Sequence, residues 1–334
     1  MSKHPVSRAG GRGSLLLVNY HYIRDPAATR YPGIHPMAPA DFAAQVRDLA
    51  GRFHMASPAE AVAFLWGERP LPGPSVLLTF DDGLKDHLWA ARTVLEPLGL
   101  RGVFLPISRP LTEGRAAAVH KVHWLRAHTP PAEFRERFVR ALPAEWQPMS
   151  ADPTLRHEAA AMYVYDPADQ AVLKFLINFR LPPELVDEIA SAMLREHGED
   201  EAVFCATLYL SREDLRAMHA AGHEIAAHGH SHTPFPRLSR AAFDAEMTTC
   251  IQTLQECTGA VPQWVSYPNG RGEAVPADAD AICRRFGFRV GVTLYPGWND
   301  GGGSPYRVKR INTNEVAEVA GRAEAPAQPQ AARS

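Results

Sequence analysis

The sequence predicts an α/β fold, an irregular (β/α) barrel of parallel strands that is interrupted by a helical insertion. Short apolar strand patterns alternate with amphipathic helix patterns along most of the 334 residues. Strict alternation of this kind is typical of parallel sheets. In addition, polar side chains such as Asp81 and His228 follow the predicted strands directly. A parallel barrel gathers residues that follow its strands at one face, where its active sites form.

The predicted strands are short runs rich in apolar residues, and helical patterns separate them. The pattern at 212–221 begins with a capping box formed by Ser211 and Asp214. Glycines follow the ends of several helical patterns, as is common where a helix stops. We expect strands at 15–20, 75–80, 102–106, 224–227, 263–267, 289–294 and 306–312. We expect barrel helices at 40–51, 58–67, 84–97, 212–221, 240–257 and 277–286.

The segment 75–83, which reads SVLLTFDDG, brings two adjacent carboxylates to the end of a buried strand. Adjacent side chains leave a strand in different directions, because side chains alternate between its faces. Asp81 and Asp82 therefore suit two different tasks. One carboxylate can hold a metal ion while the other handles protons.

A second motif, GHEIAAHGHSHTP at 222–234, places His228 and His232 four residues apart. In a helical turn this spacing puts both imidazoles on one face. Two histidines and one carboxylate form a ligand set that suits a divalent ion and leaves positions open for water and substrate. A single histidine is more often a satisfied structural residue, but the ordered pair of motifs favours a metal site.

TFDDG followed by GHEIAAHGHSH resembles the first two motifs of the polysaccharide deacetylases, carbohydrate esterases built on the chitooligosaccharide deacetylase domain. The resemblance spans most of 14–312. It implies a divalent ion, zinc or a relative such as cobalt or nickel, bound by Asp82, His228 and His232. It also implies that Asp81 is the catalytic base. This division agrees with physical chemistry, because a metal ion acidifies water and polarises a carbonyl while a nearby carboxylate takes the proton.

A third family motif is present in altered form as VSYPNG at 265–270. Many relatives have an arginine at the position of Ser266, and that arginine orients the base, so this chain departs from the pattern. The version with Tyr-Pro resembles the poly-N-acetylglucosamine deacetylase branch. This resemblance implies that the backbone N–H of Asn269 faces the developing oxyanion, where a fixed donor contributes most. A plain proline turn after a strand is the alternative.

The family's usual general acid, a histidine near the end of the domain, is not evident, because no histidine follows Tyr295. The segment 15–23, LLLVNYHYI, offers a replacement, since its apolar strand pattern ends at His21. This opening resembles that of the poly-N-acetylglucosamine deacetylases, whose domain is circularly permuted. The resemblance implies that His21 is the general acid, and a structural histidine at a strand end is the alternative.

Four further residues near predicted strand ends are candidates for substrate binding. Tyr267 and Pro268 belong to the third motif. Trp298 lies in a glycine-rich loop, where an indole either stacks on a sugar ring or anchors the loop on the barrel. Arg310 resembles an arginine common near the end of such domains, and it is a candidate for the positive group missing at Ser266.

Residues 108–204 interrupt the family pattern with helix-like stretches edged by prolines. We expect a helical insertion that shapes the substrate cleft as a cap or makes a contact in a homodimer. The barrel then comprises 14–107 and 205–315, and the segments 1–13 and 316–334 are expected to be disordered. Five residues of the insertion either touch sugar or phosphate or form the mixed face of an amphipathic helix: His120, Lys121, His123, Trp124 and Arg126.

Composition favours a cytoplasmic enzyme. A formal net charge of -2, with 35 basic and 37 acidic residues, offers no general attraction for nucleic acid or an anionic membrane. The apolar run at 15–18 is too short for a signal-peptide core or a membrane span. The four cysteines lack metal-finger spacing, and buried free thiols are expected.

Together, these features predict a metal-dependent N-deacetylase that releases acetate from an N-acetylated sugar in a cytoplasmic glycan, glycolipid or nucleotide-sugar intermediate. A carbohydrate O-acetyl esterase would use the same site. An amidohydrolase acting on a non-sugar ring is less favoured, because the family relatives of that kind lack the Tyr-His opening. A non-catalytic glycan-binding homologue is the alternative from a different class, and Ser266 keeps it open.

Overall fold

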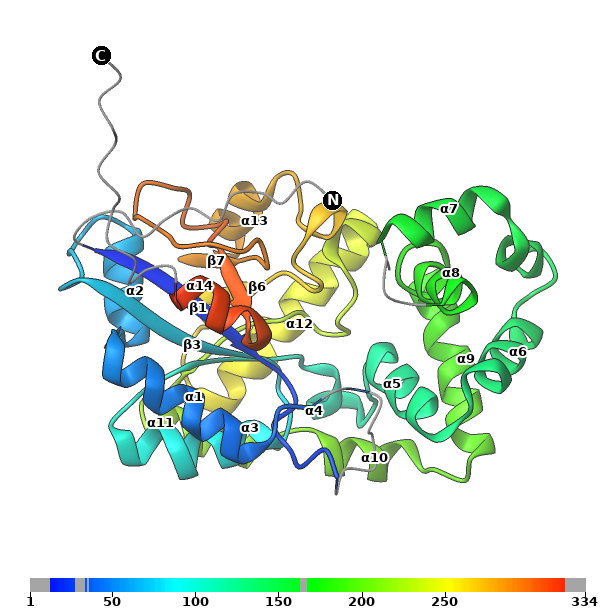
Figure 1. Cartoon of the computed structure of the whole chain (residues 1–334), viewed down its shortest axis with the longest axis horizontal. Coiled ribbons are helices and arrows are strands. Elements are labelled where there is room, and N and C mark those ends of the chain that lie inside the picture. Colours follow the sequence, from blue (N-terminus) through cyan, green and yellow to red (C-terminus); the bar gives the residue numbers. More distant parts are fainter. Residues whose placement is uncertain (1–12, 28–33, 35, 163–166, 322–334) are drawn as a thin grey trace, which may run out of the picture. The chain divides into compact units, whose positions relative to one another are not determined.

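A computed structural model describes residues 13–27, 34, 36–162 and 167–321 of the chain. The segments 1–12 and 322–334, for which disorder was expected, lie outside the described residues. The chain forms two compact units (Figure 1). The first, here the barrel unit, contains Met1–Ile23, Pro39–Ser108 and Leu210–Ser334. The second, here the helical unit, contains Arg24–Ala38 and Arg109–Tyr209, so it includes an early segment that the predicted insertion did not.

The barrel unit is built on parallel strands. Its main sheet has the order β5-β4-β3-β1-β8, and β2 pairs with the beginning of β3. All seven residues of β1 are buried. Burial on both faces explains its continuous apolar sequence, which is typical of parallel sheets covered by helices. The strands are β1 (Ser14–Tyr20), β2 (His54–Met55), β3 (Pro74–Asp82), β4 (Val103–Pro106), β5 (Glu224–Ile225) and β8 (Arg310–Asn312).

Two further strands close the sheet into a barrel. β6 (Trp264–Ser266) and β7 (Val290–Val292) pair in parallel. A parallel bridge between Ala227 and Val265 connects β6 to the end of β5, and another between Val292 and Val308 connects β7 to the segment before β8. Among the described residues, the ring therefore runs β1-β3-β4-β5-β6-β7-β8 and returns to β1. The predicted irregular (β/α) barrel is confirmed.

Helices follow the strands of the barrel unit as expected. Ser57 and Ser211 each form a capping box, and the left-handed glycines Gly99 and Gly259 end their helices. α3 continues through a π-helical segment, Ala91–Leu95, and a short 3-10 turn, Glu96–Leu98. The helices are α1 (Pro39–Arg52), α2 (Pro58–Leu65), α3 (Asp86–Ala90), α11 (Arg212–Ala220), α12 (Arg240–Thr258), α13 (Ala279–Phe286) and α14 (Val316–Gly321).

The start of the predicted disordered tail is helical, which corrects the boundary at 316. α14 occupies Val316–Gly321, and Val316, Val319 and Ala320 are buried. Apolar side chains spaced three and four apart share one helix face, and burying that face stabilises the helix. The alanine-rich composition of the tail hid this pattern. None of the described helices is long and apolar enough to cross a membrane.

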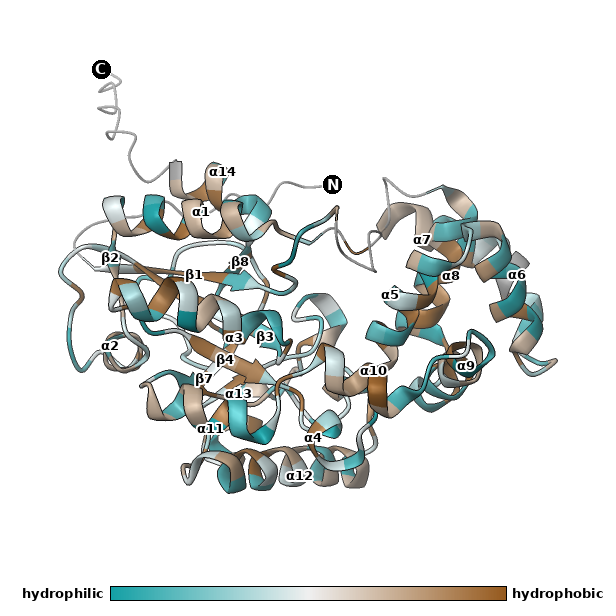
Figure 2. Cartoon of the chain, turned by 90° about the horizontal axis from the view of Figure 1, so that it is seen from below, coloured by the Kyte–Doolittle hydropathy of each residue, from teal (hydrophilic) through white to brown (hydrophobic). Residues whose placement is uncertain are grey.

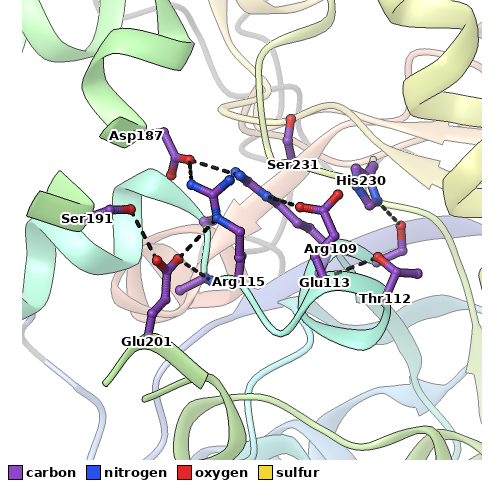
Figure 3. A network of polar contacts seen from close by, with 12 residues as sticks. Arg109, Thr112, Glu113, Arg115, Asp187, Ser191, Glu201, His230 and Ser231 are labelled. Atoms are coloured by element: carbon purple, nitrogen blue, oxygen red, sulfur yellow. Dashed lines mark hydrogen bonds and ion pairs between the residues drawn. The ribbon is translucent and has the colours of Figure 1, made fainter. Parts of the chain in front are cut away.

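The helical unit is held together by apolar packing and by a buried cation. Lys121 is fully buried, and its ammonium group contacts Asp187 at 2.8 Å and Ser191 at 2.7 Å, and pairs also with Glu201. Figure 3 shows Arg115, with Arg109, on the same Asp187. Lys121 is therefore a structural residue. The helices are α4 (Arg109–Glu113), α5 (Ala118–His128), α6 (Pro131–Ala141), α7 (Pro153–Met162), α8 (Ala168–Phe175), α9 (Pro183–Glu196) and α10 (Glu201–Leu208).

Apolar residues gather in the barrel interior. Figure 2 colours β4 as hydrophobic, and all four residues of this strand are buried. A cluster that includes Leu15, Leu77, Leu105 and Trp264 joins residues of β1, β3, β4 and β6. Tight packing of these strands fixes the positions of the residues that follow them. Polar side chains at the carboxyl ends of the strands are therefore held on a rigid support.

Candidate active site

Asp81 and Asp82 are the last two residues of β3, and both are buried. The chain turns sharply behind them because Gly83 has a φ of 73°. A Cβ atom at Gly83 would lie 2.5 Å from the Cβ atom of Pro106, so no larger residue fits. The carbonyl of Gly83 accepts a hydrogen bond of 2.9 Å from the N–H of Leu210. The glycine of the DDG motif thus lets β3 end close against β4.

Asp82, His228 and His232 come together as the motifs predicted. The Oδ1 atom of Asp82 lies 3.5 Å from Nε2 of His228 and 3.3 Å from Nε2 of His232. One ligand atom from each residue lies within 4.8 Å of the others, a geometry that can hold a metal ion. The expected helical turn is wrong, because 228–232 is an irregular loop. The geometry of this loop, and not a helix, brings the two histidines together.

Hydrogen bonds fix the histidine loop from behind. Nδ1 of His228 donates to the backbone carbonyl of Ser266 at 2.9 Å, which leaves the Nε2 lone pair facing Asp82. The buried carboxylate of Glu246, on α12, accepts hydrogen bonds of 2.7 Å from the N–H groups of both His230 and Ser231. Sequence reasoning missed Glu246, since an acidic residue in a long polar helix gives no signal of its own.

The electrostatic field around His228 is negative. Burial lowers the pKa of this histidine, but the carboxylates of Asp81 and Asp82 raise it more, so the net shift is upward. A field that favours a proton on an imidazole also favours a divalent cation between the same groups. The donor set of two imidazoles and one carboxylate therefore fits a divalent metal ion both geometrically and electrostatically.

Arg310 lies directly against Asp81. Its Nη1 and Nη2 atoms donate to Oδ1 and Oδ2 of Asp81 at 2.7 and 2.6 Å. Burial raises the pKa of Asp81, but Arg310 and His228 lower it more, to about 2. The guanidinium also donates to Oγ of Ser266 at 2.8 Å. Arg310 on β8 thus supplies the positive group that the sequence lacks at Ser266, and the small serine leaves room for it.

Polar residues of the strands complete the surroundings of Arg310. Asn19 on β1 and Thr79 on β3 face each other in the strand register, and both accept hydrogen bonds from the guanidinium, at 3.0 and 3.3 Å. Nε of Arg310 donates to the carbonyl of Thr293 at 3.2 Å. Sequence analysis did not single out these residues. The signal was available, because Asn19 and Thr79 interrupt otherwise apolar strands.

Backbone strain is concentrated at this site. Among the described residues, the non-glycine residues with positive φ are Asp82 at 77°, His232 at 67° and Asn269 at 67°. A left-handed conformation costs an ordinary residue about 1–3 kcal/mol and is typical of functional sites. Two of the three are the metal-ligand candidates Asp82 and His232, and the third is the candidate oxyanion donor. Asp, Asn and His tolerate this conformation better than other non-glycine residues, and the surrounding fold holds these three in it.

Comparison with known proteins agrees with this geometry. Residues 180–291 match the polysaccharide deacetylase family model, and the match includes His228, His232 and the third motif. This part of the chain is therefore similar in sequence to a polysaccharide deacetylase domain. No curated protein sequence matches the chain.

Several solved structures have a similar fold. IcaB from Ammonifex degensii superposes with a TM-score of 0.57 at 19% identity, over 96% of this chain and 100% of that chain. Streptococcus pyogenes deacetylase PplD, in complex with acetate, gives a TM-score of 0.55 at 14% identity, over 90% and 93%. The BpsB deacetylase domain from Bordetella bronchiseptica gives 0.50 at 16%, over 92% and 97%. The superpositions show that this chain shares their fold.

His21 lies at the same end of the barrel as the two aspartates. β1 and β3 are in register from Ser14 opposite Pro74 to Tyr20 opposite Phe80, so the next residues are His21 and Asp81. The His21 side chain is half-buried and is close enough to contribute to the lowered pKa of Asp81. Nε2 of His87 donates to the carbonyl of His21 at 2.9 Å and fixes its backbone. The role of His21 as general acid stays a prediction.

The four substrate-binding candidates are all buried in the barrel unit, and their role in substrate binding stays a prediction. The Tyr267 hydroxyl donates to the carbonyl of Tyr306 at 2.8 Å, inside the barrel wall. Trp298 is 4% exposed and packs on Phe53 with ring centroids 5.8 Å apart, so the loop-anchor alternative is correct. Pro268 is buried, and Arg310 is fully buried against Asp81. These side chains shape the site from within the fold.

Proposed function

We propose that this protein is a divalent-metal-dependent N-deacetylase acting on an N-acetylated amino sugar of a cytoplasmic glycan, glycolipid or nucleotide sugar. The observation that carries the proposal is the placement of Asp81, bound by Arg310, beside the ligand set of Asp82, His228 and His232. A metal-ligand set next to a separate buried carboxylate provides both parts that amide hydrolysis needs.

In the proposed reaction, water attacks the acetyl carbonyl and the C–N bond then breaks, giving acetate and a free amine. Asp82, His228 and His232 would hold a zinc, cobalt or nickel ion, which supplies a Lewis acid for the carbonyl and acidifies water. Asp81 accepts the proton from the attacking water. Arg310 keeps this carboxylate ionised and holds both of its oxygens in place.

Two further residues complete the proposed reaction. The backbone N–H of Asn269 donates to the oxygen that becomes negative when water adds to the carbonyl. Asn269 is exposed and adopts a left-handed conformation in the turn that follows β6. His21 gives a proton to the departing nitrogen, since an amine leaves as a neutral group only after protonation.

The position of Arg310 favours an enzyme over a non-catalytic glycan-binding protein. Ser266 had kept the non-catalytic alternative open, because many similar proteins have an arginine there that orients the base. The guanidinium of Arg310 reaches both Oγ of Ser266 and the carboxylate of Asp81. The positive group is retained by a different strand, so the substitution at Ser266 no longer argues against catalysis.

The proposal is tested by measuring acetate release from matched substrates. Protein loaded with zinc or cobalt is incubated with N-acetylglucosamine oligomers, N-acetylated nucleotide sugars, lipid-linked N-acetyl sugars and O-acetylated xylan fragments. We expect release from at least one N-acetyl substrate, and loss of release in Asp81→Asn. Release from O-acetyl substrates alone would identify a carbohydrate O-acetyl esterase. No release from any substrate by the metal-loaded protein would contradict both activities.

A further inference from the structure

The His21 loop, residues 21–23, is held at two points by helix α3. The pairing of β1 with β3 ends one residue before this loop, so that pairing does not fix His21 itself. The backbone carbonyl of His21 accepts the 2.9 Å hydrogen bond from Nε2 of His87. Two residues later, the N–H of Ile23 donates to Oδ2 of Asp86, also at 2.9 Å. Both hydrogen bonds come from the first turn of α3, which begins at Asp86.

The first turn of α3 is itself anchored in the core of the barrel unit. The His87 ring is fully buried and packs against the rings of Phe80, on β3, and Phe104, on β4, with centroid distances of 5.4 and 6.1 Å. Asp86 directly precedes this anchored residue. Because protein cores are closely packed, such an anchor leaves the turn little freedom to move. The carboxylate of Asp86 is therefore an acceptor in a fixed position beside the His21 loop.

We propose that Asp86 is a positioning residue for His21, an inference that rests on the proposed function, in which His21 protonates the departing amine. A general acid must lie within hydrogen-bonding distance of the atom that it protonates. Asp86 holds the backbone of the His21 loop through the N–H of Ile23, and hydrogen bonds to carboxylates are stronger than those to neutral acceptors. The segment 81–87 thus supplies the base, one metal-ligand candidate and the support of the acid.

Hydrogen–deuterium exchange of the full-length protein tests the support of the loop independently of activity. Asp86→Ala removes the acceptor of the Ile23 N–H, so exchange at this amide should become about tenfold faster or more. Asp86→Asn keeps an acceptor oxygen and should retain most of the protection. Glu60→Ala is the matched control, because its carboxylate accepts a 2.8 Å hydrogen bond from the N–H of Ser57, next to β2 at the beginning of β3. Unchanged exchange at Ile23 in Asp86→Ala would overturn the proposal.

Rates on two substrates test the consequence for catalysis. Hydrolysis of N-acetylglucosamine oligomers needs the acid, whereas hydrolysis of 4-nitrophenyl acetate does not, so His21→Ala defines the pattern of a lost acid. Zinc-loaded Asp86→Ala should show the same pattern, with kcat on the oligomers lowered by about tenfold to 10²-fold and unchanged metal content. Asp86→Asn should keep most of the rate, and Glu60→Ala should keep both rates.

The outcomes separate the positioning role from the proposed function. If His21→Ala slows both substrates equally, the acid assignment of the proposed function fails, and the positioning role of Asp86 fails with it. If His21→Ala affects the oligomers selectively and Asp86→Ala does not, the proposed function stands and the positioning role alone is overturned. Circular dichroism verifies that each variant is folded.

Discussion

At the scale of single residues, the two adjacent aspartates that the sequence singled out contact different partners. Asp82 faces the histidines, and Asp81 is bound by Arg310. The aspartates and histidines could be predicted because they stand together in short motifs. Arg310 was expected near Ser266, but its burial was not, since the strands that surround it are distant in sequence. The burial of Trp298 was equally invisible, because a loop sequence does not reveal what its side chains pack against.

The pair of Arg310 and Asp81 should be strongly coupled in stability. Arg310→Met leaves a buried carboxylate without its counter-charge, which typically costs about 3–5 kcal/mol. Asp81→Asn leaves a buried guanidinium instead. The double variant removes both charges, so its loss should be clearly smaller than the sum of the single losses. Urea unfolding in the presence of a chelator measures the four proteins, and additive losses would mean that the two groups do not stabilise each other.

His21 should matter most for substrates with a poor leaving group. An amine must gain a proton as the C–N bond breaks, whereas an activated aryl ester leaves without one. His21→Ala should therefore slow N-acetyl sugar hydrolysis by about 10² or more and largely spare aryl acetate hydrolysis. Parallel rate measurements with metal content determined for both proteins make the comparison. Equal losses on the two substrates would assign His21 a structural role and leave proton donation to another group.

At the scale of elements, the ends of the seven predicted strands lie within two residues of the observed ends, except that β8 begins four residues later than predicted. The segment predicted at 75–80 is β3, Pro74–Asp82, and that at 263–267 contains β6, Trp264–Ser266. Periodicity and burial decide such elements locally. β2 was missed because two residues give no periodicity. The loop 228–232 was mistaken for a helical turn, because its conformation depends on hydrogen bonds that its N–H groups donate to Glu246 and not on local propensity.

Glu246 should control how well the histidine loop binds metal. Glu246→Ala removes the acceptor for two backbone N–H groups, so the loop carrying His228 and His232 loses its support. Loss of such supporting contacts typically weakens metal binding by about 10–100-fold. Glu256→Ala, also on α12 but paired with Arg212 at the surface, is the matched control. Competition with a fluorescent zinc chelator measures the affinities, and equal affinities in both variants would remove Glu246 from this role.

At the scale of the whole molecule, both units bury ionisable side chains. The barrel buries a charged network around Asp81 and the helical unit buries another around Lys121. The barrel unit also buries His87 and His223, and burial lowers the pKa of each of these histidines to about 4. Such groups make the stability of the fold depend on pH.

Stability should fall as the pH decreases from about 6.5 to about 4. The unfolded chain takes up protons on these histidines near their ordinary pKa, whereas the folded chain does so only near 4. The contribution of the two neutral histidines to the free energy of unfolding is therefore complete above a pH of about 6.5, and it declines as the pH falls below that value. For metal-free protein, urea unfolding at a series of pH values should show a flatter dependence in His87→Gln than in the natural chain. An unchanged slope would mean that His87 is not buried in its neutral form.

The most direct test of the central claim is the metal content and turnover of matched variants. The natural protein is compared with four variants: Asp82→Ala, His228→Ala, His232→Ala and Asp81→Asn. Each protein is loaded with zinc and dialysed in parallel with the others. Elemental analysis then measures the bound metal, and acetate release measures turnover. We predict that the alanine variants lose most of the metal, because each removes one of three protein ligands. Asp81→Asn should retain the metal but lose about 10² to 10⁴ in rate. Full metal occupancy in all three alanine variants, or undiminished turnover by Asp81→Asn, would contradict the account.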